Sequence, residues 1–82
     1  MLNPSDSNTQ HVKLVLETAL LASQEPLSVN VLRKMFDSGL NNDTVTNLLE
    51  EIRDEWKDRG VELVNLASGW RFQTKPQFRE FI

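Results

Sequence analysis

The chain has 82 residues, a net charge of −3, a hydrophobic content of 39% and no cysteine. A chain of this length forms one small domain, which buries roughly 60% of its unfolded surface in a single core. The missing cysteine excludes disulfides and thiolate metal sites, and the negative charge gives no overall attraction to nucleic acid or to anionic membranes. No apolar run reaches the roughly 20 residues of a membrane span, and the polar N-terminus lacks the features of a signal peptide. We therefore expect a cytoplasmic protein without membrane contact.

The N-terminal segment, residues 1–10, is polar and is predicted to be a flexible tail before a domain of residues 11–82. The first helix is expected to begin near Asn8 or Thr9 and to end near Ser23. Its predicted core face carries, at helical spacing, Val12, Val15, Leu16, Ala19, Leu20 and Ser23.

A second line of side chains on this helix, formed by Leu14, Thr18 and Leu21, lies away from the core face. Isolated apolar side chains are common on protein surfaces, and this is one interpretation of the two leucines. Because the leucines lie two turns apart on one line, the other interpretation is a surface for a second subunit or another partner.

The sequence Gln24-Glu25-Pro26 ends the first helix, because proline disfavours helical backbone at the residue before it. A second helix is expected after Ser28, a good N-cap. Leu27 and Leu32 flank this cap at the spacing of a hydrophobic staple. Ser38-Gly39 is expected to end the helix, with the glycine as a left-handed cap.

A third helix is expected from Asn41 or Asn42 to about Asp58, with a narrow apolar stripe on one side. The stripe consists of Val45, Leu48, Leu49, Ile52 and Trp56. The opposite side is predicted to be exposed and is called here the acidic ridge, which consists of Asp43, Glu50, Asp54 and Asp58.

The rest of the chain is predicted to form a β-hairpin and a short helix. Residues 61–67 and 70–74 have strand character, with Ser68-Gly69 as a two-residue turn that would place Ala67 opposite Trp70. Pro76 is favourable in the first turn of a final helix. The chain stops on apolar side chains, which we interpret as a fragment of a longer protein.

The predicted order is helix, helix, helix, hairpin, helix. This order is typical of a winged helix-turn-helix, a mainly α fold with a small β-hairpin.

The residues that catalysis, cofactors or metals require do not converge anywhere in this pattern. His11 is the single histidine and has no predicted partner that could orient it. The carboxylates of residues 50–55 are expected on a solvent-facing surface, where weak ion pairs with nearby basic residues explain them. Each of the three glycines sits at a turn or a helix end, so none forms a phosphate-binding loop. The sequence predicts a protein that is not an enzyme and has no catalytic, cofactor or metal site.

DNA binding is the alternative that the predicted fold raises. A DNA-reading winged helix inserts its third helix into the major groove, where basic and amide side chains contact phosphates and base edges. Here the acidic ridge occupies that side and repels phosphate. Arg71 on the hairpin and Arg53 and Lys57 on one flank of the third helix could still contact DNA. The domain of a DNA-binding transcriptional regulator is therefore kept as the alternative to a protein-binding domain.

Two stretches of the sequence resemble one known family. Leu16 to Ser28, LETALLASQEPLS, resembles the opening of segregation and condensation protein B. Arg59 to Val64, RGVELV, and Ser68 to Pro76, SGWRFQTKP, are similar to the first wing of the same family. Both stretches occur in the family's order and spacing, and the resemblance extends from about His11 to Ile82.

The resemblance implies a bacterial, non-enzymatic protein of the cytoplasm that joins the nucleoid through its complex. Members of the family have two winged-helix domains in tandem and form homodimers largely through the first, which this chain would represent. They bind the kleisin subunit ScpA, which bridges the heads of the SMC ATPase, in chromosome condensation and segregation. Leu14, Thr18 and Leu21 then become the candidate dimer surface. This assignment rests on their spacing, because no family motif assigns residues there.

Overall fold

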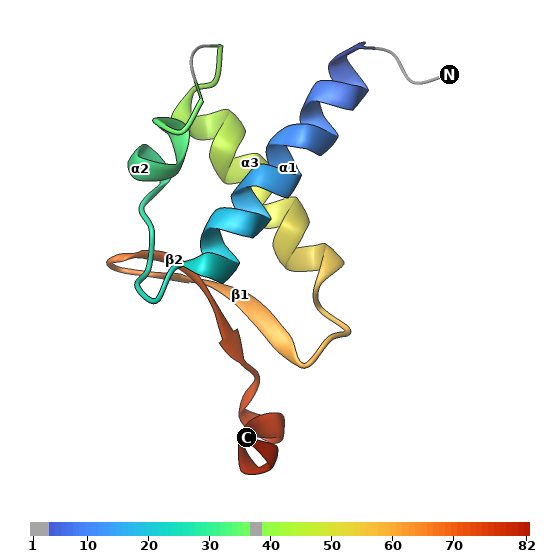
Figure 1. Cartoon of the computed structure of the whole chain (residues 1–82), viewed down its shortest axis with the longest axis vertical. Coiled ribbons are helices and arrows are strands. Elements are labelled where there is room, and N and C mark those ends of the chain that lie inside the picture. Colours follow the sequence, from blue (N-terminus) through green and yellow to red (C-terminus); the bar gives the residue numbers. More distant parts are fainter. Residues whose placement is uncertain (1–3, 37–38) are drawn as a thin grey trace.

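The computed structural model describes residues 4–36 and 39–82, and their order of elements is the one expected for a winged helix. Three helices lie above a two-stranded hairpin, and a final helical segment projects beyond it (Figure 1). The elements are α1 (Pro4–Ala22), α2 (Val29–Arg33), α3 (Asn42–Glu55), β1 (Val61–Leu66), β2 (Gly69–Thr74) and the 3₁₀ helix η1 (Pro76–Phe81).

Helix α1 begins earlier than the sequence pattern indicated. It starts at Pro4 instead of Asn8 or Thr9, so residues 4–10, which were expected in a flexible tail, are helical in the structure. Proline is well tolerated at this first position, because its missing N–H would have no partner there in any case. The remaining residues of the expected tail, 1–3, lie outside the described part of the chain.

Helix α2 begins as predicted and ends early. Ser28 is its N-cap, and the side-chain oxygen accepts a hydrogen bond of 3.1 Å from the backbone N–H three residues later. The helix stops at Arg33, and residues 34–36 follow in turns. Two of these turns are closed by hydrogen bonds to carbonyls three residues back, which tighten the end of the helix. The expected cap, Gly39, lies beyond this end at φ +85°, and Ser38 lies outside the described residues.

Helix α3 also begins as predicted and ends one turn early. The side chain of Asn41 accepts a hydrogen bond of 2.8 Å from the N–H of Thr44 and caps the helix. The helix ends at Glu55, with Trp56 as the C-cap, instead of continuing to Asp58. Asp58 therefore lies in the turn between α3 and β1.

The hairpin turn is displaced by one residue from its expected position. It consists of Ala67-Ser68 instead of Ser68-Gly69, because the last residue of β1 pairs with Gly69. Trp70 consequently lies opposite Asn65 and not opposite Ala67. This difference shifts the pairing by two positions, and because side chains alternate with a period of two, Leu63 and Trp70 stay on the same face of the hairpin.

The turn comes so close to the segment before α2 that only glycine fits at position 69. Leu27 and Trp70 exchange two backbone hydrogen bonds, each of 2.8 Å, so that Leu27 acts as a one-residue third strand beside β2. Gly69 has φ +137°, and a Cβ atom on it would lie 2.5 Å from the carbonyl carbon of Leu27. This contact fixes the hairpin beneath the helices.

The core consists of one cluster that all three helices and the hairpin share. Its members come from the apolar sides of the three helices and from the hairpin, with Trp70 from β2 2% exposed. Of the face predicted on the first helix, Leu16 and Leu20 are buried, whereas the other four residues are half-buried. Trp56 lies at the edge of the cluster, where its ring centroid is 4.6 Å from that of Phe72. The buried residues are Leu16, Leu20, Leu32, Val45, Leu48, Leu49, Ile52, Leu63 and Trp70.

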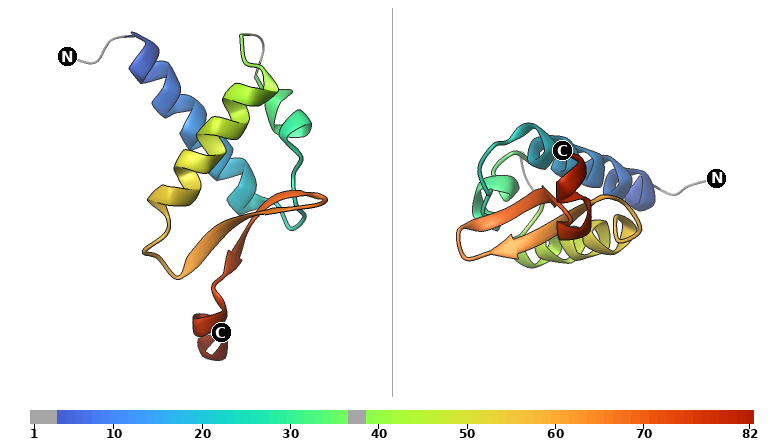
Figure 2. Two further views of the ribbon diagram at one scale, coloured as in Figure 1. Left: turned by 180° about the vertical axis from the view of Figure 1, so that it is seen from behind. Right: turned by 90° about the horizontal axis from the view of Figure 1, so that it is seen from below.

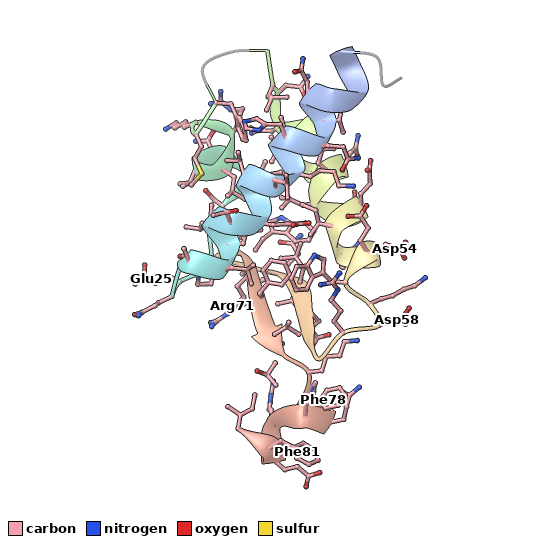
Figure 3. The ribbon with its side chains drawn as sticks, turned by 45° about the vertical axis from the view of Figure 1, so that its right-hand side comes forward. Glu25, Asp54, Asp58, Arg71, Phe78 and Phe81 are labelled. Atoms are coloured by element: carbon pink, nitrogen blue, oxygen red, sulfur yellow. The ribbon has the colours of Figure 1, made fainter. Side chains whose placement is uncertain are left out.

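The final segment, η1, is a 3₁₀ helix that carries its apolar side chains largely in solvent. Phe78 and Phe81 project from it below the hairpin (Figure 3), and they are 42% and 75% exposed. Ile82 after it is 92% exposed. The expected helix after Pro76 is therefore present as a single short 3₁₀ element that adds little to the core.

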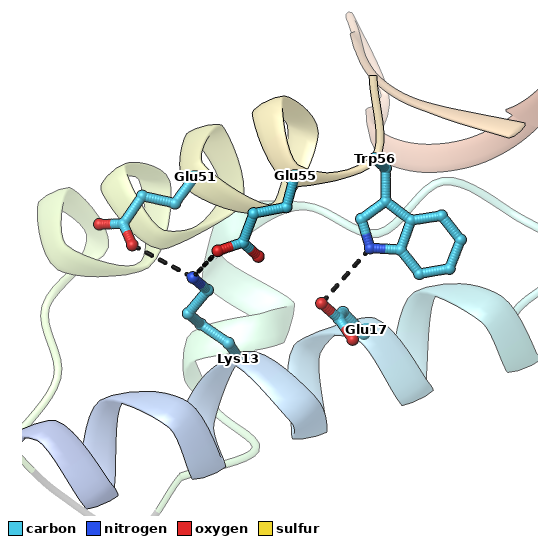
Figure 4. Close-up of polar contacts among 5 residues, drawn as sticks. All are labelled: Lys13, Glu17, Glu51, Glu55 and Trp56. Carbon is cyan, nitrogen blue, oxygen red and sulfur yellow. Dashed lines mark hydrogen bonds and ion pairs between the residues drawn. The ribbon is translucent and has the colours of Figure 1, made fainter. Parts of the chain in front are cut away.

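One polar contact joins α1 to α3 across the edge of the core. Lys13 is 5% exposed, and its Nζ lies 3.3 Å from Oε1 of Glu51 and 2.5 Å from Oε2 of Glu55 (Figure 4). The sequence pattern did not indicate that this lysine is buried, although its position is in phase with Leu16 and Leu20. Burial by itself lowers the pKa of Lys13, but hydrogen bonds and charge attraction from the two glutamates outweigh burial and raise the pKa above its ordinary value of 10.5.

A second contact joins the same two helices one turn further along α1. The indole Nε1 of Trp56 donates a hydrogen bond of 3.4 Å to Oε2 of Glu17 (Figure 4). The guanidinium carbon of Arg59 lies 4.4 Å from the centroid of the same indole ring, a favourable cation–π distance. These contacts fix the orientation of the C-terminal end of α3 against α1.

We expect Gly69→Ala to destabilise the fold by on the order of 3 kcal/mol, because the added methyl group meets the Leu27 backbone and alanine is strained at a positive φ. Gly60→Ala is the matched control, since its methyl group would lie 3.7 Å from the Phe78 ring, at ordinary contact distance. We expect the control to change the free energy of unfolding by less than about 0.5 kcal/mol. Urea denaturation of both variants tests this, and equal midpoints would contradict the proposed close approach.

We expect Lys13→Met to lower the free energy of unfolding by about 1 kcal/mol near neutral pH, because the charge-assisted hydrogen bonds are lost while the apolar stem is kept. The folded-state pKa of Lys13 is raised, so its stabilisation is complete below pH 10.5 and is lost as the pH rises through the higher folded-state pKa. The difference between wild type and variant should therefore be constant from about pH 7 to 9.5 and shrink above that range.

Lys34→Met provides the control for this measurement, because Lys34 is exposed at the end of α2. Its difference from wild type should stay small across the same pH range. A Lys13→Met difference that grows with alkaline pH would contradict the assigned role of the ion pair.

Candidate protein-binding surfaces

The outer line of α1 is exposed, as the sequence pattern predicted. Leu14 is 61% exposed and Leu21 is 54% exposed, and Thr18 between them is also exposed. The Thr18 hydroxyl donates a hydrogen bond of 2.7 Å to the carbonyl of Leu14, so its polar group is already satisfied within the helix. The line therefore offers apolar contact area without a polar group that needs a partner.

A shallow hollow lies along this line and widens the apolar surface. It is lined by His11, Leu14, Val15, Thr18 and Ala19. Val15 was expected in the core, but it is half-buried and lines this hollow. The imidazole of His11 lies at its rim and is exposed, which fits a surface histidine better than a catalytic one.

The outer line and the contact with α3 lie on different sides of α1. Consecutive residues of an α-helix are about 100° apart, so Leu14 points well away from Lys13, which faces α3. Helix α1 crosses α3 in the front and back views (Figures 1 and 2), and the two helices are in contact. A partner on the outer line would therefore leave the α1–α3 contact intact.

The acidic ridge is exposed along α3 and into the turn after it. Asp43, Glu50 and Asp54 lie on the helix and Asp58 follows it, and all four are exposed. Asp54 and Asp58 both project into solvent on the α3 side of the molecule (Figure 3). The predicted exposure of the ridge is thus observed, although the helix itself carries only three of its four residues.

Two basic residues neutralise part of the ridge. Nη2 of Arg53 lies 3.6 Å from Oε2 of Glu50, and Nζ of Lys57 lies 3.5 Å from Oδ1 of Asp54. All four side chains are about half exposed or more, so these pairs contribute little to stability and exchange readily with solvent. Arg53 and Lys57 point toward the groove between α3 and the hairpin, whose lining they share.

The hairpin of β1 and β2, which is the wing of this fold, carries one basic residue, Arg71, in the place expected from the sequence. Arg71 lies on β2 (Figure 3) and is half-buried. Its Nε is buried and has no hydrogen-bond partner among the described residues. Because part of the guanidinium is withdrawn from solvent, it is poorly placed for the phosphate contact that a DNA-binding wing makes.

Among residues 4–36 and 39–82, no helix combines the length and the apolar character that crossing a bilayer requires.

Comparisons with known proteins identify relatives of this chain. Residues 14–82 match the family model of the segregation and condensation complex subunit ScpB. A segregation and condensation protein B homolog of Coxiella burnetii is 40% identical over 72 residues, which are 85% of this chain and 34% of the relative. Segregation and condensation protein B of Myxococcus xanthus is 27% identical over 77 residues, 92% of this chain and 23% of that protein. The chain thus spans about a third or less of the length of these relatives.

Solved structures share the fold over nearly the whole chain. ScpB of Mycobacterium tuberculosis has a TM-score of 0.81 at 25% identity, covering 99% of this chain and 48% of that one. A dimer of an ScpB N-terminal domain complexed with an ScpA peptide has a TM-score of 0.70 at 18% identity, covering 98% of this chain and 88% of that one. The predicted winged-helix fold is confirmed, and the chain belongs to the family of the segregation and condensation complex subunit ScpB.

Proposed function

We propose that this chain is the first winged-helix domain of a scaffold subunit in a bacterial SMC–kleisin complex, acting in chromosome condensation and segregation. In this role the domain forms a homodimer and binds the kleisin ScpA, and it catalyses no reaction. The single observation that carries the proposal is the match of residues 14–82 to the ScpB family. The protein works in the cytoplasm and reaches the nucleoid through its SMC partner.

The dimer part of the proposal assigns the contact to Leu14, Thr18 and Leu21. Large apolar side chains on one exposed line favour association, because each loses water when a second copy covers it. A twofold interface would place the same line on both copies, so one apolar stripe serves both partners. A dimer of an ScpB N-terminal domain with the same fold supports dimerisation of this chain, and the choice of these three residues rests on their spacing and exposure.

The kleisin part of the proposal has a different basis. The ScpB N-terminal domain with the same fold forms its complex with an ScpA peptide, and this chain covers 88% of that domain. A peptide partner also agrees with the acidic ridge, because exposed carboxylates repel the phosphates of a duplex but tolerate a polypeptide.

We expect Leu21→Asp to weaken self-association by at least about 2 kcal/mol, because a carboxylate would be buried between apolar surfaces. The monomer should stay folded, since the side chain is already 54% exposed. Sedimentation velocity over a concentration series measures the shift from dimer to monomer.

Val31→Asp is the matched control for the dimer test. Val31 is 46% exposed on α2, so the substitution places the same charge on an apolar surface elsewhere. It should leave the mass distribution unchanged. Equal behaviour of Leu21→Asp and wild type, with the wild type dimeric at that concentration, would rule out this surface.

A gel shift at low salt distinguishes the proposed function from the alternative, the DNA-binding domain of a transcriptional regulator. Electrostatic binding to DNA is strongest at low salt. We expect no complex between this chain and duplex DNA under these conditions. A complex that weakens steeply as salt is raised would favour the alternative. If the carboxylates of the acidic ridge prevent DNA binding, the double variant Glu50→Gln/Asp54→Asn should bind duplex DNA more tightly than wild type.

A further inference from the structure

The outer side of α1 carries no free charge along residues 11–22. Besides His11, the titratable side chains of this stretch are Lys13 and Glu17, and both are engaged on the side of α3. Lys13 pairs with two glutamates of α3, and Oε2 of Glu17 accepts a hydrogen bond from the indole of Trp56. The outward side of the helix is therefore made of apolar and uncharged groups, which is the composition of the middle of a protein interface.

The hollow on this side has the arrangement that receives a side chain from a facing helix. Of the residues that line it, His11, Leu14, Val15 and Thr18 occupy positions i, i+3, i+4 and i+7 of α1. Four residues at these positions form the hole into which a knob residue of a neighbouring helix inserts. Ala19 lines the hollow beside them, and its short side chain leaves room for the knob.

Leu21 is the side chain of α1 that is best placed to be this knob. It is 54% exposed, and it lies two turns beyond Leu14 near the end of the helix. Insertion into the hollow removes its apolar surface from water without burying a charge. Because the hollow and the knob belong to the same helix, a twofold axis between two copies makes the contact twice. The outer side of α1 is thus complementary to itself.

We propose that α1 packs antiparallel against α1 of a second copy, with Leu21 of each copy inserted in the hollow of the other. His11 closes the N-terminal end of the hollow and becomes an interface residue. With Leu21 seated between Leu14 and Val15, the twofold axis passes close to Thr18, halfway between the knob and the hollow. Thr18 suits this place because its side chain is small and its hydroxyl is already bonded to the carbonyl of Leu14. The second copy is the homodimer partner of the proposed function, on which this arrangement rests.

An antiparallel pair fits the shape of the domain better than a parallel pair. The hairpin and the loop before α2 lie at the C-terminal end of α1, whereas the N-terminal end of α1 projects away from them (Figure 1). Antiparallel packing places the two hairpins at opposite ends of the helix pair. A parallel pair would insert Leu14 of the partner in the hollow instead, and it would bring the two hairpins side by side at the same end.

Disulfide cross-linking distinguishes the two arrangements, because the chain has no cysteine of its own. In the antiparallel pair, Leu14 of one copy lies opposite Leu21 of the other. A mixture of Leu14→Cys and Leu21→Cys proteins, one of them tagged, should therefore form a mixed disulfide dimer under mild oxidation. Neither variant should link with itself, because its two copies lie about 10 Å apart along the helices. A disulfide spans only about 7 Å between Cα atoms.

Two further cysteine variants serve as controls for this measurement. Thr18→Cys lies near the axis and should link with itself, which shows that the outer side of α1 is the interface. Val31→Cys is also exposed but lies on α2, so it should remain unlinked under the same conditions.

His11→Asp tests the assigned place of the histidine without a thiol. We expect self-association to weaken at least about tenfold in sedimentation velocity, because the carboxylate would lose water against Leu21 of the partner. The monomer should stay folded, since His11 is exposed. Gln77→Asp adds the same charge at an exposed position of η1 and should leave self-association unchanged. Equal dissociation constants for His11→Asp and wild type would contradict the placement of His11 in the interface.

The outcomes separate this arrangement from the proposed function. If the wild type is dimeric and each leucine variant links with itself while the mixture gives no mixed dimer, the pair is parallel, and the proposed function stands. If the wild type is monomeric at every concentration, the homodimer of the proposed function fails and the arrangement fails with it. If the amides of α1 in a monomeric chain become protected from hydrogen exchange only when ScpA is added, the hollow holds the kleisin and the second copy is excluded.

Discussion

The contact between Leu27 and Trp70 is the constraint on which the arrangement of this domain depends. Its two backbone hydrogen bonds join the loop before α2 to β2, and Gly69 permits the approach because it has no Cβ. The contact places Trp70 under the three helices, where its ring completes the core. It also fixes the phase of the hairpin relative to the helices.

Carboxylates serve two different purposes on α3. Glu51 and Glu55 face α1 and hold the buried ammonium group of Lys13, which would be costly to bury without them. Residues of the acidic ridge face solvent and contribute little to stability, because their ion pairs are exposed. The same helix is thus attached to α1 through one set of acids and presents the other set to solvent.

The proposed dimer surface lies away from the contacts that hold the core together. Leu14, Thr18 and Leu21 lie on the outer side of α1, whereas Lys13 on the same helix faces Glu51 and Glu55 of α3. A dimer formed through α1 would therefore leave the packing of α1 against α3 unchanged in each copy.

The sequence by itself determined the order of elements, the cap Ser28, a cap at Asn41 or Asn42, most of the apolar faces and the exposure of the acidic ridge. These features follow from local periodicity and local hydrogen bonding, which a sequence records directly. The structure corrected the helix ends, and it corrected the hairpin turn because close packing of Gly69 against a distant loop set the register. Only tertiary contacts decided that Lys13 is buried, since its burial depends on which segments come together.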